Sequence, residues 1–174
     1  MNISTMLRSL PIAALVLFAA AAPAATISLS TTLAGANEVP PNASPGFGGG
    51  TMTYDDVTNQ LDWNITFSNL VAGATAAHFH GPAAPGTSAS VQIPIPLGAS
   101  SGMTSGLLTG SATLTNAQGT QLLSDLWYVN IHSSVFPAGE IRGQAQVVPL
   151  PAAAWLLISG LSGLTLTSVR RRGM

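Results

Sequence analysis

The sequence predicts an all-β, mainly antiparallel domain, either a β-sandwich or a Greek-key barrel of about seven or eight strands with one short helix. Three observations support this class. Segments with a hydrophobic period of two recur between residues 27 and 147, as in LDWNITFS (61–68). Gly- and Pro-rich stretches separate them, the longest at 35–50 and 81–90. Uncharged apolar segments flank the domain and predict an N-terminal signal peptide and a C-terminal transmembrane helix.

The strands follow from alternating apolar and polar side chains. In the segment 61–68, Leu61, Trp63, Ile65 and Phe67 fall on one face and polar residues on the other, as in a half-buried antiparallel strand. The turn formers DDVTNQ precede it and predict a hairpin with GTMTYDD (50–56). The same alternation predicts further strands in the segments 26–33, 106–115, 126–133 and 139–148.

One short helix is expected in NAQGTQLLSDLW (116–127). Thr115 and Gln118 have the spacing of a capping box, with a hydroxyl at the N-cap and an amide three residues later. Leu122, Leu123 and Leu126 would face the sheet. Gly119 weakens a helix by roughly 1 kcal/mol, which limits the prediction to two or three turns at most.

The first 24 residues are predicted to be a secretory signal peptide. Arg8 precedes an apolar run, and Ala22-Pro23-Ala24 supplies the small residues of a cleavage site, so cleavage is expected after Ala24. An uncleaved anchor is the alternative, but the run is short for a membrane span. The sequence therefore predicts export, with the export machinery and a signal peptidase as partners.

The C-terminal segment 148–174 combines a proline-containing motif, an apolar stretch and a basic end. Residues 152–169 carry no charge, and as a helix they would span roughly 27 Å, close to the hydrocarbon thickness of a bilayer. Arg170, Arg171 and Arg172 follow directly and are expected to stay cytoplasmic. A transmembrane helix is predicted at 152–169, with the preceding domain outside the cytoplasm.

This segment resembles the bacterial C-terminal sorting tails called PEP-CTERM, in their VPLPA variant. The resemblance rests on the arginine cluster, on Trp155 early in the apolar stretch, and on the motif Val148, Pro149, Leu150, Pro151 and Ala152. It implies a Gram-negative source, an exosortase-type protease as partner, cleavage near the motif, and delivery to the cell surface or extracellular matrix. A permanent single-span anchor in the inner membrane is the alternative.

The charge of the domain excludes some partners. Between residues 25 and 148 the only basic residue is Arg142. Nucleic acid and anionic lipid are disfavoured, since both need a basic patch. The chain has no cysteine, which excludes disulfide and thiol chemistry. The acids, all in this domain, are Glu38, Asp55, Asp56, Asp62, Asp125 and Glu140.

Four short stretches, in a characteristic order and spacing, carry a second resemblance: GANEVPP (35–41), ATAAHFHGPAAPG (74–86), LWYVNIH (126–132) and GEIRGQ (139–144). Together they resemble the CHRD domain, the repeat named from chordin and found singly in many bacterial secreted proteins. The resemblance places one domain at 25–147. It implies a compact, mostly β extracellular module but no activity, and no catalytic residue can be carried over from it.

The histidines are the candidate site. Residues i and i+2 of a strand share a face, so His78 and His80 point the same way. His132 and Glu140 lie in two other predicted segments. If these are neighbours, the four side chains converge, and three imidazoles with a carboxylate or an open position suit Zn²⁺ or Cu²⁺. The alternative is a structural polar cluster in which His80 and His132 hydrogen-bond to nearby loops.

Two functions are consistent with these observations. The first is a non-enzymatic exported module at the surface or in the matrix, with a binding, adhesion or structural role, no cofactor and an extracellular ligand that the sequence does not identify. No phosphate-binding glycine loop argues for an enzyme. The second is a Zn- or Cu-binding extracytoplasmic protein that uses the histidines, with redox activity as a further option.

Overall fold

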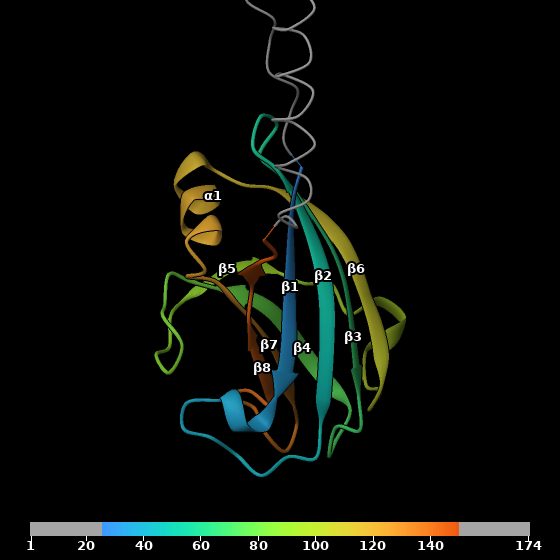
Figure 1. Ribbon diagram of the computed structural model, residues 1–174. Helices are drawn as coiled ribbons and strands as arrows, with labels where there is room; N and C mark the ends of the chain where they lie inside the picture. The colour runs from blue at the N-terminus through green and yellow to red at the C-terminus, as the bar shows by residue number, and fades with distance from the viewer. Residues whose placement is uncertain (1–25, 150–174) are drawn as a thin grey trace, which may run out of the picture.

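The computed structural model describes residues 26–149, which form nine β-strands, one α-helix and two 3-10 helices (Figure 1). The helix α1 is Asn116–Leu123, and the 3-10 helices are η1 (Gly35–Asn37) and η2 (Gly98–Ser100). The strands are β1 (Thr26–Ala34), β2 (Phe47–Asp55), β3 (Gln60–Ser68), β4 (Ala74–His80), β5 (Val91–Pro94), β6 (Gly106–Thr113), β7 (Tyr128–Ser133), β8 (Ile141–Gln144) and β9 (Gln146–Val147).

The two predicted terminal signals lie outside the described residues. This applies to the signal peptide at 1–24, to the transmembrane helix at 152–169 and to the arginine cluster at 170–172. Of the sorting motif, Val148 and Pro149 are described, and both are exposed. Within residues 26–149 no helix has the length and apolar character needed to cross a membrane.

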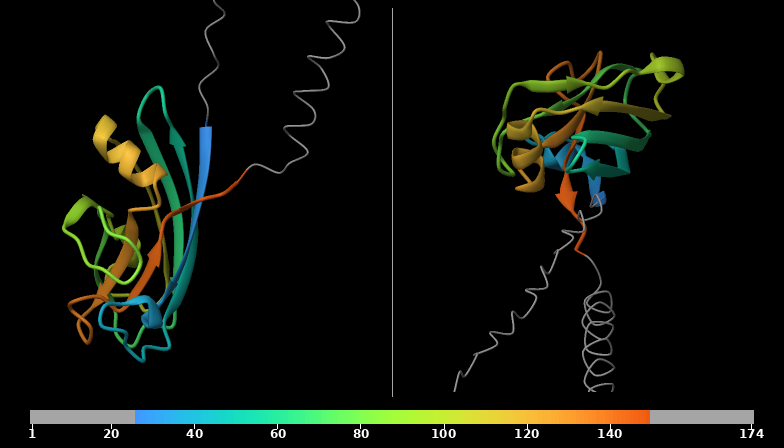
Figure 2. Two further views of the ribbon diagram at one scale, coloured as in Figure 1. Left: turned by 60° about the vertical axis from the view of Figure 1, so that its left-hand side comes forward. Right: turned by 90° about the horizontal axis from the view of Figure 1, so that it is seen from above.

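The strands pair antiparallel in one continuous sheet, in the order β5-β4-β7-β8-β1-β2-β3-β6, with β9 beside β1. The sheet curves so strongly that distant strands face each other across the core (Figure 2). Trp63 of β3 packs edge to face on Phe79 of β4, with ring centroids 5.3 Å apart. The predicted all-β antiparallel class with one short helix is confirmed, in a barrel-like arrangement of one sheet.

The core forms as the alternation predicts. Leu61, Trp63, Ile65 and Phe67 are all buried on one face of β3. β2 and β3 pair along their whole length, and the predicted turn connects them. On β4 and β7 the apolar face also points inward, and this leaves a polar face outside, where the candidate site lies.

Two features of the sheet differ from the prediction. β2 begins at Phe47, inside the predicted loop 35–50, because its glycines allow close strand packing: a Cβ at Gly50 would lie 2.7 Å from the Asn64 carbonyl oxygen. β5 has no alternating pattern and ends at Pro94. Its position at the edge of the sheet explains this, since an edge strand tolerates a residue that lacks an N–H group.

The helix α1 begins as predicted. Thr115 and Gln118 form both halves of the capping box. Leu122 is fully buried, and Leu123 packs against the core. Gly119 has a role that its helix propensity does not show, because a side chain there would collide with the hydroxyl of Tyr54. Glycine thus lets α1 lie close to β2.

We predict that Gly119→Ala destabilises the protein by about 1–3 kcal/mol through overpacking, although alanine is the better helix former. The measurement is the free energy of unfolding in denaturant. In a Tyr54→Phe background the same substitution should cost less, because the colliding oxygen is gone. A stabilising effect of Gly119→Ala would show that α1 does not pack on Tyr54.

Candidate metal centre and the polar cleft beside it

The outer face of β4, β7 and β8 carries a row of polar and ionisable side chains. In the strand register His78 lies opposite Asn130, and Asn130 lies opposite Arg142. His80 lies opposite Tyr128. The loops 81–90 and 134–140 reach this face through hydrogen bonds described below. The site is therefore a polar layer between the sheet and its loops.

The three histidines of the chain meet in this layer. One ring nitrogen of each of His78, His80 and His132 lies within 4.8 Å of the other two. The closest approach joins His78 Nδ1 and His132 Nε2 at 3.2 Å. The ring centroid of His80 lies 5.5 Å from that of His78 and 6.2 Å from that of His132. The structure thus brings together the three predicted histidines from two neighbouring strands.

Backbone carbonyls of the loops fix the tautomers of two of these rings. His80 Nδ1 lies 3.0 Å from the Ala89 oxygen, and His132 Nδ1 lies 3.0 Å from the Pro137 oxygen. A carbonyl only accepts hydrogen bonds, so each Nδ1 carries the proton and each Nε2 keeps a lone pair. The Nε2 atom of His80 is buried and has no hydrogen-bond partner. A cation would satisfy this nitrogen. Metal-binding histidines commonly donate their other ring N–H to a backbone carbonyl, as His80 does to Ala89.

Burial keeps the rings neutral. The pKa of each of His78, His80 and His132 is lowered from its ordinary value of 6.5, chiefly because burial penalises the charged form. The neighbouring histidines lower the pKa of His78 further. The loop carbonyls partly oppose the shift for the other two rings. Each ring is therefore neutral near pH 7 and keeps one nitrogen without a proton, as metal ligation requires.

A stacked column braces His80. Its ring is parallel to that of Tyr128, with centroids 4.9 Å apart and an interplanar angle of 6°. The guanidinium carbon of Arg142 lies 3.4 Å from the centroid of the same tyrosine ring. Since the imidazole occupies one face of the ring, the guanidinium takes the other. The positive charge of Arg142 also lowers the pKa of His80.

Glu140 does not join the histidines, contrary to the sequence-based expectation. Its Oε1 atom accepts hydrogen bonds from Ser44 Oγ at 2.7 Å and from the Val71 N–H at 2.6 Å, and the residue is fully buried. The reason is local. Gly139, at φ +141°, turns the chain just before it, and β8 begins only at Ile141. The alternation of a strand therefore does not apply to residue 140.

Glu38 is a second buried acid, and it belongs to the same polar layer. The sequence analysis assigned it no position in the fold. It is 7 % exposed, and Asn130 Nδ2 donates to its Oε2 at 3.4 Å. Burial raises its pKa from 4.5 to about 7, although Arg142 and Asn130 oppose the shift. The only sequence signal for it was its place in the stretch GANEVPP (35–41), because a lone acid in a loop has no periodicity.

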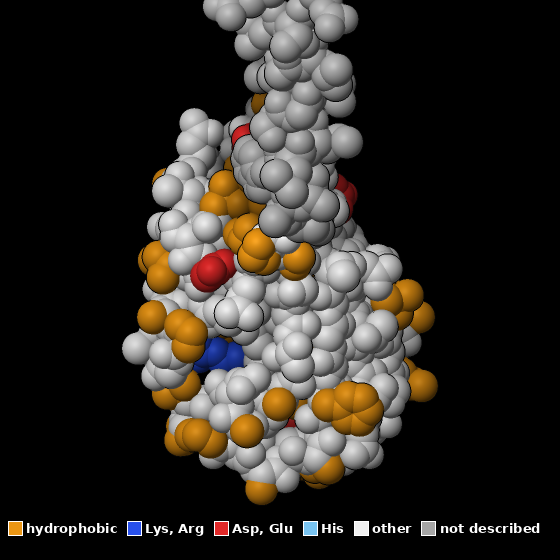
Figure 3. Space-filling view, in the orientation of Figure 1, with side chains coloured by type: hydrophobic (Ala, Val, Ile, Leu, Met, Phe, Trp, Pro, Cys, Tyr) orange, Lys and Arg blue, Asp and Glu red, His pale blue; other side chains and the backbone are white. Residues whose placement is uncertain are grey.

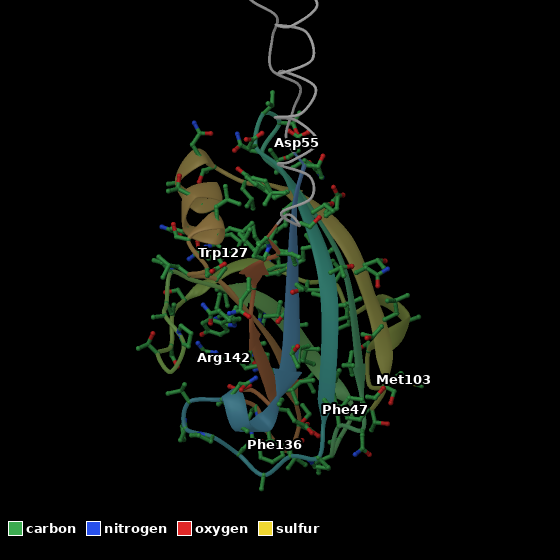
Figure 4. All side chains as sticks on the ribbon, viewed as in Figure 1. Phe47, Asp55, Met103, Trp127, Phe136 and Arg142 are labelled. Atoms are coloured by element: carbon green, nitrogen blue, oxygen red, sulfur yellow. The ribbon has the colours of Figure 1, made fainter. Side chains whose placement is uncertain are left out.

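A cleft of about 520 Å³ opens beside this layer. Figure 3 shows a basic side chain in a hollow of the surface, and Arg142 is the one Lys or Arg between residues 26 and 149. Figure 4 places Arg142 at the outer side of the sheet, where Arg142 Nη2 donates to the Thr87 oxygen at 2.6 Å. The cleft walls include Asn37, Glu38, Pro41, Pro85, Arg142 and Gln144.

Comparison with known proteins gives one match. The model of the CHRD domain family matches residues 29–145. This interval contains all three histidines, Glu38 and Arg142, together with the four stretches on which the resemblance rests. Neither the curated proteins nor the solved structures gave a significant match.

The raised pKa of Glu38 predicts a loss of stability as the pH rises from about 4.5 to about 7. The folded state keeps this proton up to about pH 7, whereas the unfolded chain releases it near 4.5. The stabilising effect of the bound proton is therefore lost as the pH rises through 7. The histidines act in the opposite sense, since their lowered pKa values reduce stability only as the pH falls below 6.5.

Glu38→Gln should accordingly remove the contribution of Glu38, so the melting temperature of the wild type relative to the variant should fall between about pH 4.5 and pH 7 and stay level above about pH 8. The measurement is thermal unfolding as a function of pH. Asp62→Asn, which removes an exposed carboxylate on β3, serves as the control and should keep the wild-type slope. Equal slopes for wild type and Glu38→Gln would contradict a buried, proton-holding Glu38.

Proposed function

The chain belongs to the CHRD domain family, and we propose that it is an exported, non-enzymatic binding module that holds a transition-metal ion with His78, His80 and His132. The single observation that carries this proposal is the convergence of three ring nitrogens within 4.8 Å. Two of these nitrogens have lone pairs fixed by loop carbonyls.

The donor set favours Zn²⁺ or Cu²⁺. Neutral imidazole suits both ions, and Zn–N bonds of about 2.0–2.1 Å place tetrahedral ligands roughly 3.3 Å apart. His78 Nδ1 and His132 Nε2, at 3.2 Å, already have this spacing. A small approach of the His80 ring would complete a three-nitrogen site. Glu140 is engaged with Ser44 and Val71, so water or an external ligand would take the fourth position.

The role of His78 differs from that of the other two rings. His132 Nε2 carries no proton, so the 3.2 Å contact requires a proton on His78 Nδ1. Metal binding would replace this hydrogen bond and move the proton to the other nitrogen of His78. Acid should weaken binding, because a protonated imidazole cannot ligate.

The non-enzymatic role and the remaining partners rest on the charge pattern. The two acids nearest the polar layer, Glu38 and Glu140, are both buried, and each accepts hydrogen bonds within the domain. Arg142, the single cation of the domain, is buried as well. Neither acid belongs to the histidine group, which favours binding over catalysis at the proposed metal site. The buried cation does not favour a nucleic-acid partner, because such a partner needs a basic patch.

We further propose export through the signal peptide and sorting through the C-terminal tail. The sequence support is Arg8 with the cleavage pattern at Ala24, and the tail from Val148 to Arg172. An exosortase-type protease would act on a protein that is transiently anchored in the inner membrane. The module would then reach the cell surface or the extracellular matrix of a Gram-negative bacterium.

The metal proposal predicts that the full chain, purified in mild detergent, binds one Zn²⁺ or Cu²⁺ per chain. At a free metal concentration about 100 times Kd, binding should stabilise the fold by about 2.7 kcal/mol. His132→Gln should weaken binding by tenfold or more, since one of three ligands is lost. Titration calorimetry and metal-dependent melting measure both effects.

Glu140→Gln is the matched control, because it removes a carboxylate that the structure places away from the histidines. It should leave metal affinity unchanged. Less than about a tenth of an equivalent of bound metal after supplemented dialysis, with an unchanged melting temperature, would refute the metal site. Equal losses from Glu140→Gln and His132→Gln would instead place the carboxylate in the site.

The sorting proposal predicts a shorter mature protein in cells that contain an exosortase. Intact mass spectrometry should show loss of Trp155 and everything after it, whereas a strain that lacks the protease should retain the tail. Arg171→Glu in the arginine cluster tests the membrane orientation in the same assay. Identical masses in both strains, each including Trp155, would show a permanent anchor.

A further inference from the structure

The cleft beside Arg142 has features of a second binding site, distinct from the histidines. Arg142 lines the cleft and is only 2 % exposed. Its guanidinium donates a hydrogen bond to the Thr87 carbonyl oxygen and stacks on the Tyr128 ring. No carboxylate between residues 26 and 149 hydrogen-bonds this group. A buried cation is costly without an anion beside it. The domain thus holds its one cation ready for an external anion.

Glu38 does not neutralise this charge in full. Glu38 lines the same cleft, but its Oε2 atom accepts a hydrogen bond from Asn130 and not from Arg142, and burial raises its pKa to about 7 although the charge of Arg142 opposes the shift. Near neutral pH a substantial fraction of Glu38 is therefore uncharged. In that fraction of molecules no acid compensates the charge of Arg142, which favours an anionic ligand.

The guanidinium is fixed in one orientation. The Thr87 oxygen engages Nη2, and Tyr128 supports the plane of the group. A guanidinium has five N–H donors in a planar fork, and a carboxylate matches two of them at once. A ligand carboxylate therefore suits this position.

The amides of the cleft specify what surrounds that carboxylate. Asn37 Nδ2 donates to the Arg142 carbonyl oxygen at 3.0 Å. Gln144 Nε2 donates to the carbonyl oxygens of Ala83 and Asp125 at 2.9 and 2.6 Å. With their NH₂ groups engaged, both side chains offer carbonyl oxygens, which accept hydrogen bonds only. Hydroxyl groups on the ligand would supply the donors, whereas phosphate or sulfate would not.

The walls add a weakly apolar surface. Ala36, Val39, Pro41 and Pro85 line the cleft around the polar floor. Short aliphatic side chains and proline rings can contact the C–H groups of a compact ring without demanding hydrogen bonds.

We propose that this cleft binds a hydroxylated carboxylate of the uronic-acid type, with its carboxylate on Arg142 and its hydroxyl groups on the oxygens of Asn37 and Gln144. The site is separate from the proposed metal centre, although the Tyr128 ring lies between Arg142 and His80. Binding should therefore persist in metal-free protein and in His132→Gln, so failure of one proposal leaves the other intact.

The test is equilibrium binding of D-glucuronate to the full chain in mild detergent with a chelator present, followed by calorimetry or NMR shifts. We expect saturable binding of glucuronate and at least tenfold weaker binding of D-glucose, which lacks the carboxylate. Sulfate should also bind at least tenfold more weakly. Absence of glucuronate binding, or equal binding of glucose or sulfate, would overturn the proposal.

Variants locate the site. Arg142→Gln should weaken glucuronate binding at least tenfold. Because loss of Arg142 could disturb folding, Gln146→Glu provides a second test: this exposed wall residue adds a repelling charge without changing the core. Asn64→Asp adds the same charge on the exposed face of β3 and is the matched control, with unchanged affinity expected. Wild-type affinity in both cleft variants, or equal losses in Gln146→Glu and Asn64→Asp, would refute this location.

Discussion

Two hydrogen bonds from imidazole rings to loop carbonyls hold the polar layer together. His80 and His132 each donate from Nδ1 to a backbone oxygen, of Ala89 and Pro137 respectively. These bonds leave both Nε2 atoms without protons and fix the rings in place. They also tie the loops 81–90 and 134–140 to the outer face of the sheet. The same two hydrogen bonds therefore free the Nε2 lone pairs and hold the loops over the polar layer.

The fold makes this layer possible because one curved sheet supplies its own core. Trp63 and Phe79 meet across the interior, so β4 can bury its apolar side and keep the histidines on the other. β7 stands between β4 and β8 and brings His132 beside His78, and Tyr128 between His80 and Arg142. The histidine cluster and the cleft are therefore two ends of one polar surface, joined by the Tyr128 ring.

Much of this could be predicted from local patterns, and the exceptions have physical reasons. The alternation in β3 and the capping box at Thr115 are short-range signals, and both are confirmed. The convergence of the histidines followed from strand alternation, although the pairing of β4 with β7 could only be supposed. The sequence did not predict β5, because this edge strand has no alternating pattern. Glu140 was placed by the alternation of a strand, but β8 begins only at Ile141.

The buried polar groups could not be derived from the sequence, because their roles depend on long-range contacts. Glu38 meets Asn130 across 92 positions of the chain, and Arg142 meets Thr87 across 55. Neither pair has a periodic signal. The family resemblance marked the stretches that contain Glu38, Asn130 and Arg142, but it gave no contact, charge state or orientation. These came from the packing of loops on the sheet.

The protonation pattern of the imidazole nitrogens tests these two hydrogen bonds and the proposed metal site together. It can be read by ¹⁵N NMR of the histidine-labelled full chain at neutral pH with and without Zn²⁺. Without metal, we expect protonated Nδ1 and unprotonated Nε2 in His80 and His132. On addition of one equivalent of Zn²⁺, the Nε2 signals of these two rings and the Nδ1 signal of His78 should shift together to values typical of metal ligation. Protonated Nε2 atoms in the metal-free protein, or ring signals that do not respond to zinc, would contradict the account.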